Sequence, residues 1–261
     1  MSAPVDPTLA AERFVFDEEW YENAELRHLP RLLTGVSTFV DVGASVGPYT
    51  HCADGNMRDG RIIAVEANPD TFARLEAHCS NWRASSSNRL ETVHAAASDR
   101  VGQLELFIPD SNQLPLLSAI FTTTGAPSEW RTVTVDCVTL DDLLADAKPD
   151  LIKVDVEGAE FRVLRGAHQI LSDGRCRFLI EIHPWGDPDL GKTPADIFTL
   201  MYEYGYDFER VARHWHFRKV RRNGVVALKH RAILLVMRNG WLKRQLKTLV
   251  LAVDRLRQRS A

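Results

Sequence analysis

The 261-residue sequence is poor in cysteine, and its cysteines are not spaced for metal or redox chemistry. The four, Cys52, Cys79, Cys137 and Cys176, lie far apart and include no C-x-x-C pair. This spacing excludes a zinc knuckle and a thioredoxin-like redox motif. We expect the four to be small, buried apolar side chains in a reducing compartment.

Long apolar runs and a strong excess of one charge are also absent. No stretch approaches the ~18 apolar residues that a membrane-spanning helix requires, and the first residues lack the basic and apolar regions of a secretory signal. A formal net charge of -3 gives no general attraction to polyanions, so no nucleic-acid partner is expected. The sequence therefore predicts a cytoplasmic protein without a transmembrane segment.

Short apolar runs alternate with helical stretches after an N-terminal arm and covering helix in residues 1–37. Apolar runs of this length, rich in β-branched residues, are typical of buried parallel strands joined by crossover helices. The runs are TFVDVG, RIIAVEA, LETVHAAA, DLIKVDVEG, RFLIEIH and RAILLVM. They predict an α/β domain over residues 38–240, built on a doubly wound, mostly parallel sheet.

Two segments depart from this alternation. Residues 102–138 hold two strand-like runs around a stretch rich in proline, glycine and hydroxyl residues, which predicts an inserted hairpin or flap, a common place for substrate contacts. Residues 241–261 predict a helix with one apolar and one basic face. We expect this helix to pack on its own domain; contact with an anionic membrane surface or a partner protein is the alternative.

The run FVDVGASVG is an apolar strand that ends in a carboxylate and a Gly-x-x-x-Gly turn. Gly43 and Gly47 would let the backbone pass close to a ligand, as a nucleoside-binding turn requires. Asp41 would repel the pyrophosphate of a dinucleotide, but it suits the ammonium and sulfonium groups of S-adenosylmethionine. The run therefore favours S-adenosylmethionine over a dinucleotide.

Polar residues at the ends of the next two predicted strands support a nucleoside ligand. Glu66 ends the second strand about 25 positions after Asp41, near the spacing at which nucleotide folds place the acidic residue that accepts ribose hydroxyls. Asn68 follows where the turn would bend around the nucleoside. Ala97 and Ser98 close the third strand, and they leave room for an adenine ring and a polar group for its edge.

The run LIKVDVEGAE is the most distinctive part of the sequence. Alternation along a strand places Lys153, Asp155 and Glu157 on one side. Charges at the point where a buried strand leaves the core indicate a functional role rather than a structural one. The next strand ends in Glu181 and His183, which are expected to lie beside this cluster.

These motifs resemble those of the FkbM family of methyltransferases. The matching runs are FVDVGASVGPYT, IIAVEANPDTFARLEAH, TLDDLL, LIKVDVEGAEFRVLRGA, LIEIH and EYGYDF, in that order between about Thr38 and Phe208. The resemblance implies a class I, Rossmann-like fold with a seven-stranded, mostly parallel sheet, and O-methyl transfer from S-adenosylmethionine.

Family roles carried over by motif fall on the predicted strand ends. Asp41, Gly43 and Gly47 would hold the methionine part of the cofactor. The resemblance further assigns the ribose to Glu66 and the adenine side to Ala97 and Ser98.

Methyl transfer to a hydroxyl group also requires a base. His183 is the first candidate, because an imidazole with an ordinary pKa near 6.5 is largely neutral at neutral pH. Asp155, Glu157 and Glu181 complete the predicted catalytic group, and Asp155 is also expected to contact the cofactor. A less favoured route uses Mg²⁺ or Mn²⁺, bound by Asp155, Glu181 and His183, to hold two adjacent substrate hydroxyls.

Other interpretations share parts of this pattern. An NAD-dependent oxidoreductase or epimerase would share the fold and Glu66, but Asp41 and the absence of a Tyr-x-x-x-Lys pair disfavour it. A non-catalytic nucleoside-binding partner protein would have no physical reason to keep buried charges at the strand ends. His214 and His216 are expected to share one face of a strand, as a pocket wall or surface.

The favoured prediction is an S-adenosylmethionine-dependent methyltransferase. Its acceptor would be a hydroxyl group of a sugar, a polyketide or another secondary metabolite, free or as part of a glycan. The sequence leaves the oligomeric state open.

Overall fold

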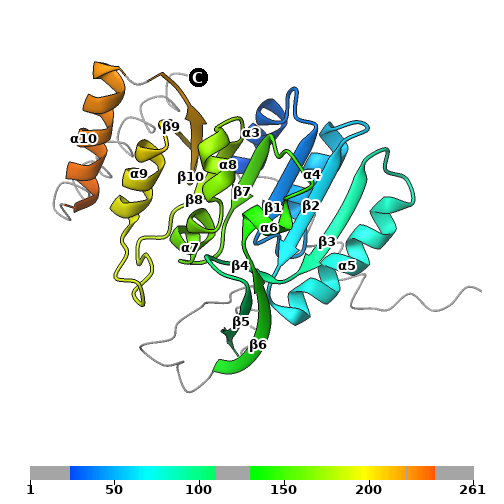
Figure 1. The fold of residues 1–261 in the computed structure, drawn as a ribbon. Coiled ribbons are helices and arrows are strands. Elements are labelled where there is room, and N and C mark those ends of the chain that lie inside the picture. Colours follow the sequence, from blue (N-terminus) through cyan, green and yellow to red (C-terminus); the bar gives the residue numbers. More distant parts are fainter. Residues whose placement is uncertain (1–23, 110–129, 222, 239–261) are drawn as a thin grey trace, which may run out of the picture.

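The computed structural model describes residues 24–109, 130–221 and 223–238, and a seven-stranded sheet forms its centre (Figure 1). The strands are β1 (Thr38–Val42), β2 (Arg61–Glu66), β3 (Arg89–His94), β7 (Leu151–Val154), β8 (Arg177–Glu181), β9 (Tyr206–Val211) and β10 (His214–Lys219). Their order is β3-β2-β1-β7-β8-β10-β9. Strand β10 is antiparallel to both neighbours and the other pairs are parallel, which confirms the predicted mostly parallel sheet.

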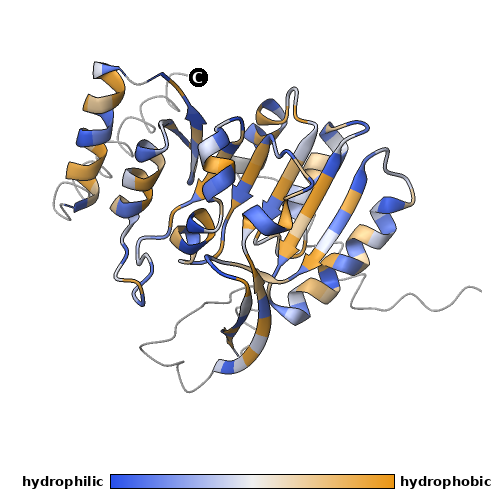
Figure 2. Cartoon of the chain, in the orientation of Figure 1, coloured by the Kyte–Doolittle hydropathy of each residue, from blue (hydrophilic) through white to orange (hydrophobic). Residues whose placement is uncertain are grey.

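Both faces of the sheet are apolar. Successive residues of a strand point to opposite sides, so a strand that is apolar throughout places apolar side chains on each face. Phe39 of β1 packs with the helices α3 (Ala24–Leu32) and α4 (Pro48–Asn56). Val40 points to the other face and belongs to the largest core cluster. Figure 2 shows the central strands as predominantly hydrophobic.

Four helices from the second half of the chain pack on the strands in that larger cluster. They are α6 (Leu140–Leu143), α7 (Glu160–Arg165), α8 (His168–Asp173) and α9 (Pro194–Glu203). Helix α5 (Pro69–Arg83) packs beside the first turn of the sheet through Leu75 and Cys79. All four cysteines of the chain are free and buried, as expected.

A smaller, three-stranded sheet projects from the end of the main sheet (Figure 1). It consists of β4 (Ala96–Ala97), β5 (Gly102–Pro109) and β6 (Trp130–Val138). Strands β5 and β6 pair antiparallel and form the two ends of the insertion expected at residues 102–138. The tip of that insertion lies outside the described residues.

The strand expected at RAILLVM is wrong, because these residues belong to the helix α10 (Gly224–Arg238). A short apolar run cannot be assigned to a strand or a helix by its periodicity alone. Here the run continues a 15-residue segment, GVVALKHRAILLVMR, which exceeds the usual length of a strand and is rich in good helix formers. The last two strands of the sheet are instead the more polar segments β9 and β10.

Two expected appendages lie wholly or mainly outside the described residues. These are the basic helix at residues 241–261 and the arm before α3. Within the described ranges, no helix has both the length and the apolar character needed to cross a bilayer.

Candidate functional site

A cavity of about 280 Å³ lies at the carboxyl ends of the parallel strands, where open α/β sheets bind their ligands. Its lining includes residues 42–45 after β1, residues 65–67 at the end of β2, residues 95–97, and residues 155–157 after β7. The volume is close to the lower end of the roughly 300–1,000 Å³ range of small-molecule pockets. The cavity therefore brings together segments that are far apart in the sequence.

The two predicted glycines of the first turn have different surroundings. Gly43 lines the cavity and has a φ of +72°, and a Cβ atom there would lie 1.8 Å from the backbone oxygen of Asp155. Only glycine lets the turn after β1 pack this closely on the turn after β7. Gly47 precedes α4 with a φ of +99°, and a Cβ atom there would lie 3.0 Å from Leu75 and Trp82. Packing thus accounts for Gly47, which is not part of the lining.

Asp41 is fully buried below the cavity and does not line it. The hydroxyl of Thr50 donates a hydrogen bond of 2.8 Å to Asp41 Oδ2, and Lys153 Nζ lies 3.2 Å from Asp41 Oδ1. Lys153 lines the cavity, donates to the carbonyl oxygen of Gly43 at 2.7 Å and lies 3.7 Å from Asp155 Oδ2. Asp41 is therefore placed to hold Lys153 and the first turn.

Lys153 keeps its charge although it is buried. Burial disfavours the ammonium group, but the charges of Asp41 and Asp155 outweigh this and raise the pKa of Lys153. Lys153 and Asp41 thus form a buried ion pair beneath the cavity.

Glu66 is held at the end of β2 by two backbone groups. Its Oε2 accepts a hydrogen bond from the amide of Ser45 at 2.9 Å, and its Oε1 accepts one from the amide of Asn68 at 2.8 Å. Burial raises the pKa of Glu66, while the two hydrogen bonds oppose that shift. The carboxylate lies on the cavity wall, at the end of β2 as the sequence predicts.

The neighbouring predicted residues are not all brought to the cavity. The side chain of Asn68 caps α5, because its Oδ1 accepts from the amides of Asp70 at 3.0 Å and Thr71 at 3.5 Å. Ala97 lines the cavity, whereas Ser98 is buried beside it and is not part of the lining. The expectation that they close the third strand is wrong, because β3 ends at His94 and Ala97 belongs to β4 of the small sheet.

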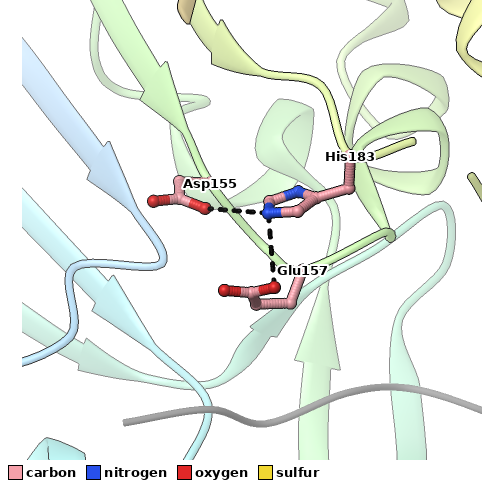
Figure 3. A group of neighbouring side chains, drawn as sticks. All are labelled: Asp155, Glu157 and His183. Atoms are coloured by element: carbon pink, nitrogen blue, oxygen red, sulfur yellow. Dashed lines mark ion pairs between the residues drawn. The ribbon is translucent and has the colours of Figure 1, made fainter. Parts of the chain in front are cut away.

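Asp155, Glu157 and His183 form a cluster after β7 and β8 (Figure 3). His183 Nε2 lies 3.2 Å from Glu157 Oε2 and 4.0 Å from Asp155 Oδ1. The two carboxylates line the cavity, while His183 is buried behind them. The cluster thus places two charged acceptor groups toward the cavity and a cation behind them.

Glu160 is a fully buried carboxylate behind His183, at the start of α7. Its Oε1 lies 2.6 Å from His183 Nδ1 and also accepts a hydrogen bond from the amide of Gly158 at 3.1 Å. Burial disfavours the imidazolium, but the hydrogen bond with Glu160 and the charges of Glu160, Glu157 and Asp155 raise the pKa of His183 to about 9. The expectation that His183 is largely neutral at neutral pH is therefore wrong.

Glu157 has a base strength above that of an ordinary carboxylate. Burial of the side chain raises its pKa, and the charges of Asp155, Glu160 and Glu181 add to that shift. The positive charge of His183 opposes it. Among the predicted catalytic residues, Glu157 combines this raised pKa with a position on the cavity wall.

Glu181 pairs with a histidine that the sequence does not connect to it. It faces His214 across the antiparallel strands β8 and β10, and His214 Nε2 lies 3.8 Å from Glu181 Oε2. His214 and His216 are both buried in β10, and His216 Nδ1 lies 2.9 Å from Glu209 Oε1. The pairing of β8 with β10 decides the first contact, and the pairing of β9 with β10 decides the second.

Two groups within the described residues have the spacing of a divalent-cation site. One is Asp155, Glu157 and His183, and the other is Asp155, Glu181 and His214, each with ligand atoms within 4.8 Å of one another. The expected trio of Asp155, Glu181 and His183 is divided between them. Carboxylate and imidazole ligands fit Mn²⁺ or Mg²⁺, although an imidazole must be neutral to bind a metal.

Three site residues were missed by sequence reasoning. Tyr49 and Arg213 line the cavity, from α4 and from the turn between β9 and β10. Tyr49 belongs to the FVDVGASVGPYT run, so that motif could have indicated it, whereas only the fold brings Arg213 to the cavity. Glu160 lies within the VDVEGAE run, and its acidic side chain one residue after the Gly-Ala turn was the signal that could have indicated it.

A family model and a curated protein match the chain. The family model described as the methyltransferase FkbM domain matches residues 41–208. Hexuronic acid methyltransferase AglP of Haloferax volcanii is 28% identical over 166 residues, which are 62% of this chain and 60% of that protein. The chain thus spans about 60% of the length of this curated relative.

Solved structures of low sequence identity also match. The crystal structure of methyltransferase FkbM from Methylobacillus flagellatus has a TM-score of 0.48 and 17% identity, covering 69% of this chain and 43% of that one. A SAM-dependent methyltransferase from Aquifex aeolicus has a TM-score of 0.42 and 12% identity, covering 82% and 97%. Since the family match spans β1 to β9, from the first turn of the cavity to beyond the acidic cluster, the chain belongs to the FkbM methyltransferase family.

Proposed function

We propose that this methyltransferase transfers the methyl group of S-adenosylmethionine to a hydroxyl oxygen of a small molecule or glycan, with a sugar as the first candidate acceptor. One observation carries the proposal: Glu66 and Glu157 lie on the wall of the same cavity. The first is suited to a nucleoside and the second to an acceptor hydroxyl. The hexuronic acid named for the relative AglP supports a sugar.

The described residues fit the cofactor. Glu66 is fixed by two amides and can accept hydrogen bonds from ribose hydroxyls, while Gly43 and Ala95–Ala97 leave room for backbone contact and for a flat ring. Asp155 offers negative charge toward a positively charged ligand. When bound, S-adenosylmethionine supplies a methyl group activated by its sulfonium. Asp41 and Gly47 support the first turn from below, Asn68 caps α5 after β2, and Ser98 follows β4 of the small sheet.

The protein's contribution to the reaction is alignment and proton acceptance. Holding acceptor and methyl group in line is worth roughly 7–11 kcal/mol in well-oriented reactions. Glu157 accepts the proton of the acceptor hydroxyl, because it lies on the wall and its raised pKa makes it a stronger base. His183 holds the Glu157 carboxylate through the 3.2 Å contact, and Glu160 holds His183 in turn. In this assignment Glu157 replaces His183 as the base.

A calorimetric titration with S-adenosylhomocysteine, beside NAD as a control, tests the cofactor. We expect binding of S-adenosylhomocysteine alone. Glu66→Ala is expected to weaken it about 10- to 100-fold without unfolding the chain, because a hydrogen-bonded charge is lost. NAD binding, or unchanged affinity in Glu66→Ala, contradicts the assignment.

Transfer of labelled methyl groups from S-adenosylmethionine to a panel of methyl glycosides tests the reaction. Glu157→Gln keeps the shape of the side chain but removes the base, and it is expected to lower turnover about 10²- to 10⁴-fold while cofactor affinity is kept. Glu76→Gln, on the outer helix α5, is the matched control. Label on nitrogen or carbon of other acceptors, with none on glycosides, contradicts O-methyl transfer to a sugar.

A further inference from the structure

Trp185 is the one aromatic residue among the exposed large apolar side chains of the described ranges, with 51% of its surface accessible. It lies two positions after His183, on the loop between β8 and α9. Its Nε1 donates a hydrogen bond to the backbone oxygen of Glu157 at 3.2 Å. An exposed indole is therefore hydrogen-bonded to the backbone of a residue of the acidic cluster.

The indole is held in place from two sides. Gly158, with a φ of +109°, lies against its edge, where a Cβ atom would be 2.7 Å from Trp185 Nε1. The His183 ring lies at a centroid distance of 4.8 Å and an angle of 35°. The two rings therefore pack against each other.

The loop that carries Trp185 is anchored by buried charges. Arg162 of α7 contacts Asp187 Oδ2 at 2.5 Å and Asp189 Oδ2 at 3.1 Å, and all three side chains are buried. Asp187 and Lys192 close the loop with two backbone hydrogen bonds of 2.9 and 2.8 Å. The exposed indole is thus presented by a fixed loop, and a preordered aromatic surface loses little entropy when a ligand binds.

We propose that Trp185 is the platform for the ring of a sugar acceptor, with the sugar hydroxyls directed to the carboxylates of Asp155 and Glu157. The face of a pyranose ring consists of C–H groups with a small positive charge, which suits the negative face of an indole. Its rim consists of hydroxyls, which donate to carboxylates. An exposed indole hydrogen-bonded to the backbone of Glu157 offers an aromatic face near these carboxylates, which matches both parts of this one ligand.

The proposal rests on the proposed function and names its acceptor as a ring with an apolar face.

Binding is measured by saturation-transfer NMR and by quenching of tryptophan fluorescence, with S-adenosylhomocysteine at saturation. The probes are methyl glycosides of glucose, mannose, galactose, rhamnose and glucuronic acid. Sorbitol is the control, since it has the hydroxyls but no ring face.

Trp185→Ala is expected to weaken binding of the preferred glycoside about 10-fold, and Trp185→Phe less, because stacking on an aromatic ring contributes a term of this size. Leu235→Ala, which shortens another exposed apolar side chain on α10, is expected to leave binding unchanged. In turnover, Trp185→Ala raises the KM for the sugar while kcat and the KM for S-adenosylmethionine stay within about twofold. Unchanged S-adenosylhomocysteine affinity shows that the variants are folded.

Three results would overturn the proposal: equal affinity in the wild type and Trp185→Ala, sorbitol binding as tightly as the glycosides, or no binding of any glycoside by the wild type. Failure of the proposed function is distinguishable. It would show as absence of S-adenosylhomocysteine binding or of methyl transfer while glycosides still bind at Trp185.

Discussion

His183 Nδ1 lies 2.6 Å from Oε1 of Glu160, a carboxylate that is fully buried at the start of α7. This contact orients the imidazole so that its Nε2 faces Glu157. It also favours the imidazolium form, because a buried negative charge is balanced by the proton on the ring. The pair decides the charge of the cluster and therefore which residue can accept a proton.

Glu160→Gln is expected to lower the pKa of His183 from about 9 toward the ordinary value near 6.5, since the variant keeps the shape but removes the charge. NMR titration of the His183 ring in chelator-treated protein measures this directly. Glu76→Gln is the control and is expected to leave the His183 signal unchanged. If the pKa of His183 remains near 9 in Glu160→Gln, the charges of Asp155 and Glu157, rather than that of Glu160, raise it.

The stability of the protein is expected to fall as the pH rises from about 6.5 to about 9. The pKa of His183 is higher in the folded state than in the unfolded state, so its contribution is complete below the unfolded value and is lost as the pH rises through the folded one. The contribution amounts to at most about 3 kcal/mol. Urea denaturation from pH 6 to pH 10 measures it, and a slope equally steep in Glu160→Gln would contradict the assignment.

Lys153→Met is expected to destabilise the protein by about 3–5 kcal/mol, because it leaves Asp41 buried without a counterion. Asp41→Asn combined with Lys153→Met is expected to recover part of that loss, since the double variant buries no unpaired charge. Urea denaturation of the two single variants and the double variant gives the coupling energy. Simple additivity of the two losses would show that the pair does not act as a unit.

Gly43→Ala and Gly55→Ala form a matched pair of glycine substitutions. The first is expected to abolish S-adenosylhomocysteine binding or folding, because its Cβ atom would lie 1.8 Å from the Asp155 oxygen in a backbone with positive φ. Gly55 lies in α4 with no atom within 4 Å of its added Cβ, so alanine there is expected to stabilise by about 0.5–1 kcal/mol. Calorimetric titration and thermal unfolding test both. Normal binding by Gly43→Ala would show that the two turns can separate.

Chelation with EDTA is expected to leave methyl transfer unchanged. The raised pKa of His183 disfavours the neutral imidazole that a metal needs, because the imidazolium offers no lone pair. Turnover is measured after EDTA treatment and again after addition of Mn²⁺ or Mg²⁺. Activity that is lost on chelation and restored by either ion would establish the metal route, with Asp155, Glu181 and His214 as the first ligands to substitute.

Much of the fold could be predicted, because a buried strand appears in the sequence as a short run of apolar residues. Four of the six apolar runs became β1, β2, β7 and β8, and residues at or just after their carboxyl ends line the cavity. The error at α10 has the same origin, since RAILLVM is as apolar as a buried strand. The sheet instead ends in β9 and β10, whose charged residues hide their strand character.

The sequence by itself determined where strands end and which polar residues follow them, because alternation and turn chemistry act over a few neighbouring positions. It thereby placed Glu66, Asp155 and Glu157 at the cavity. Only the tertiary structure decided how these groups are paired: Asp41 with Lys153, His183 with Glu160, and Glu181 with His214. Charge state and contact depend on what lies within a few ångströms in space, and those neighbours come from distant parts of the chain.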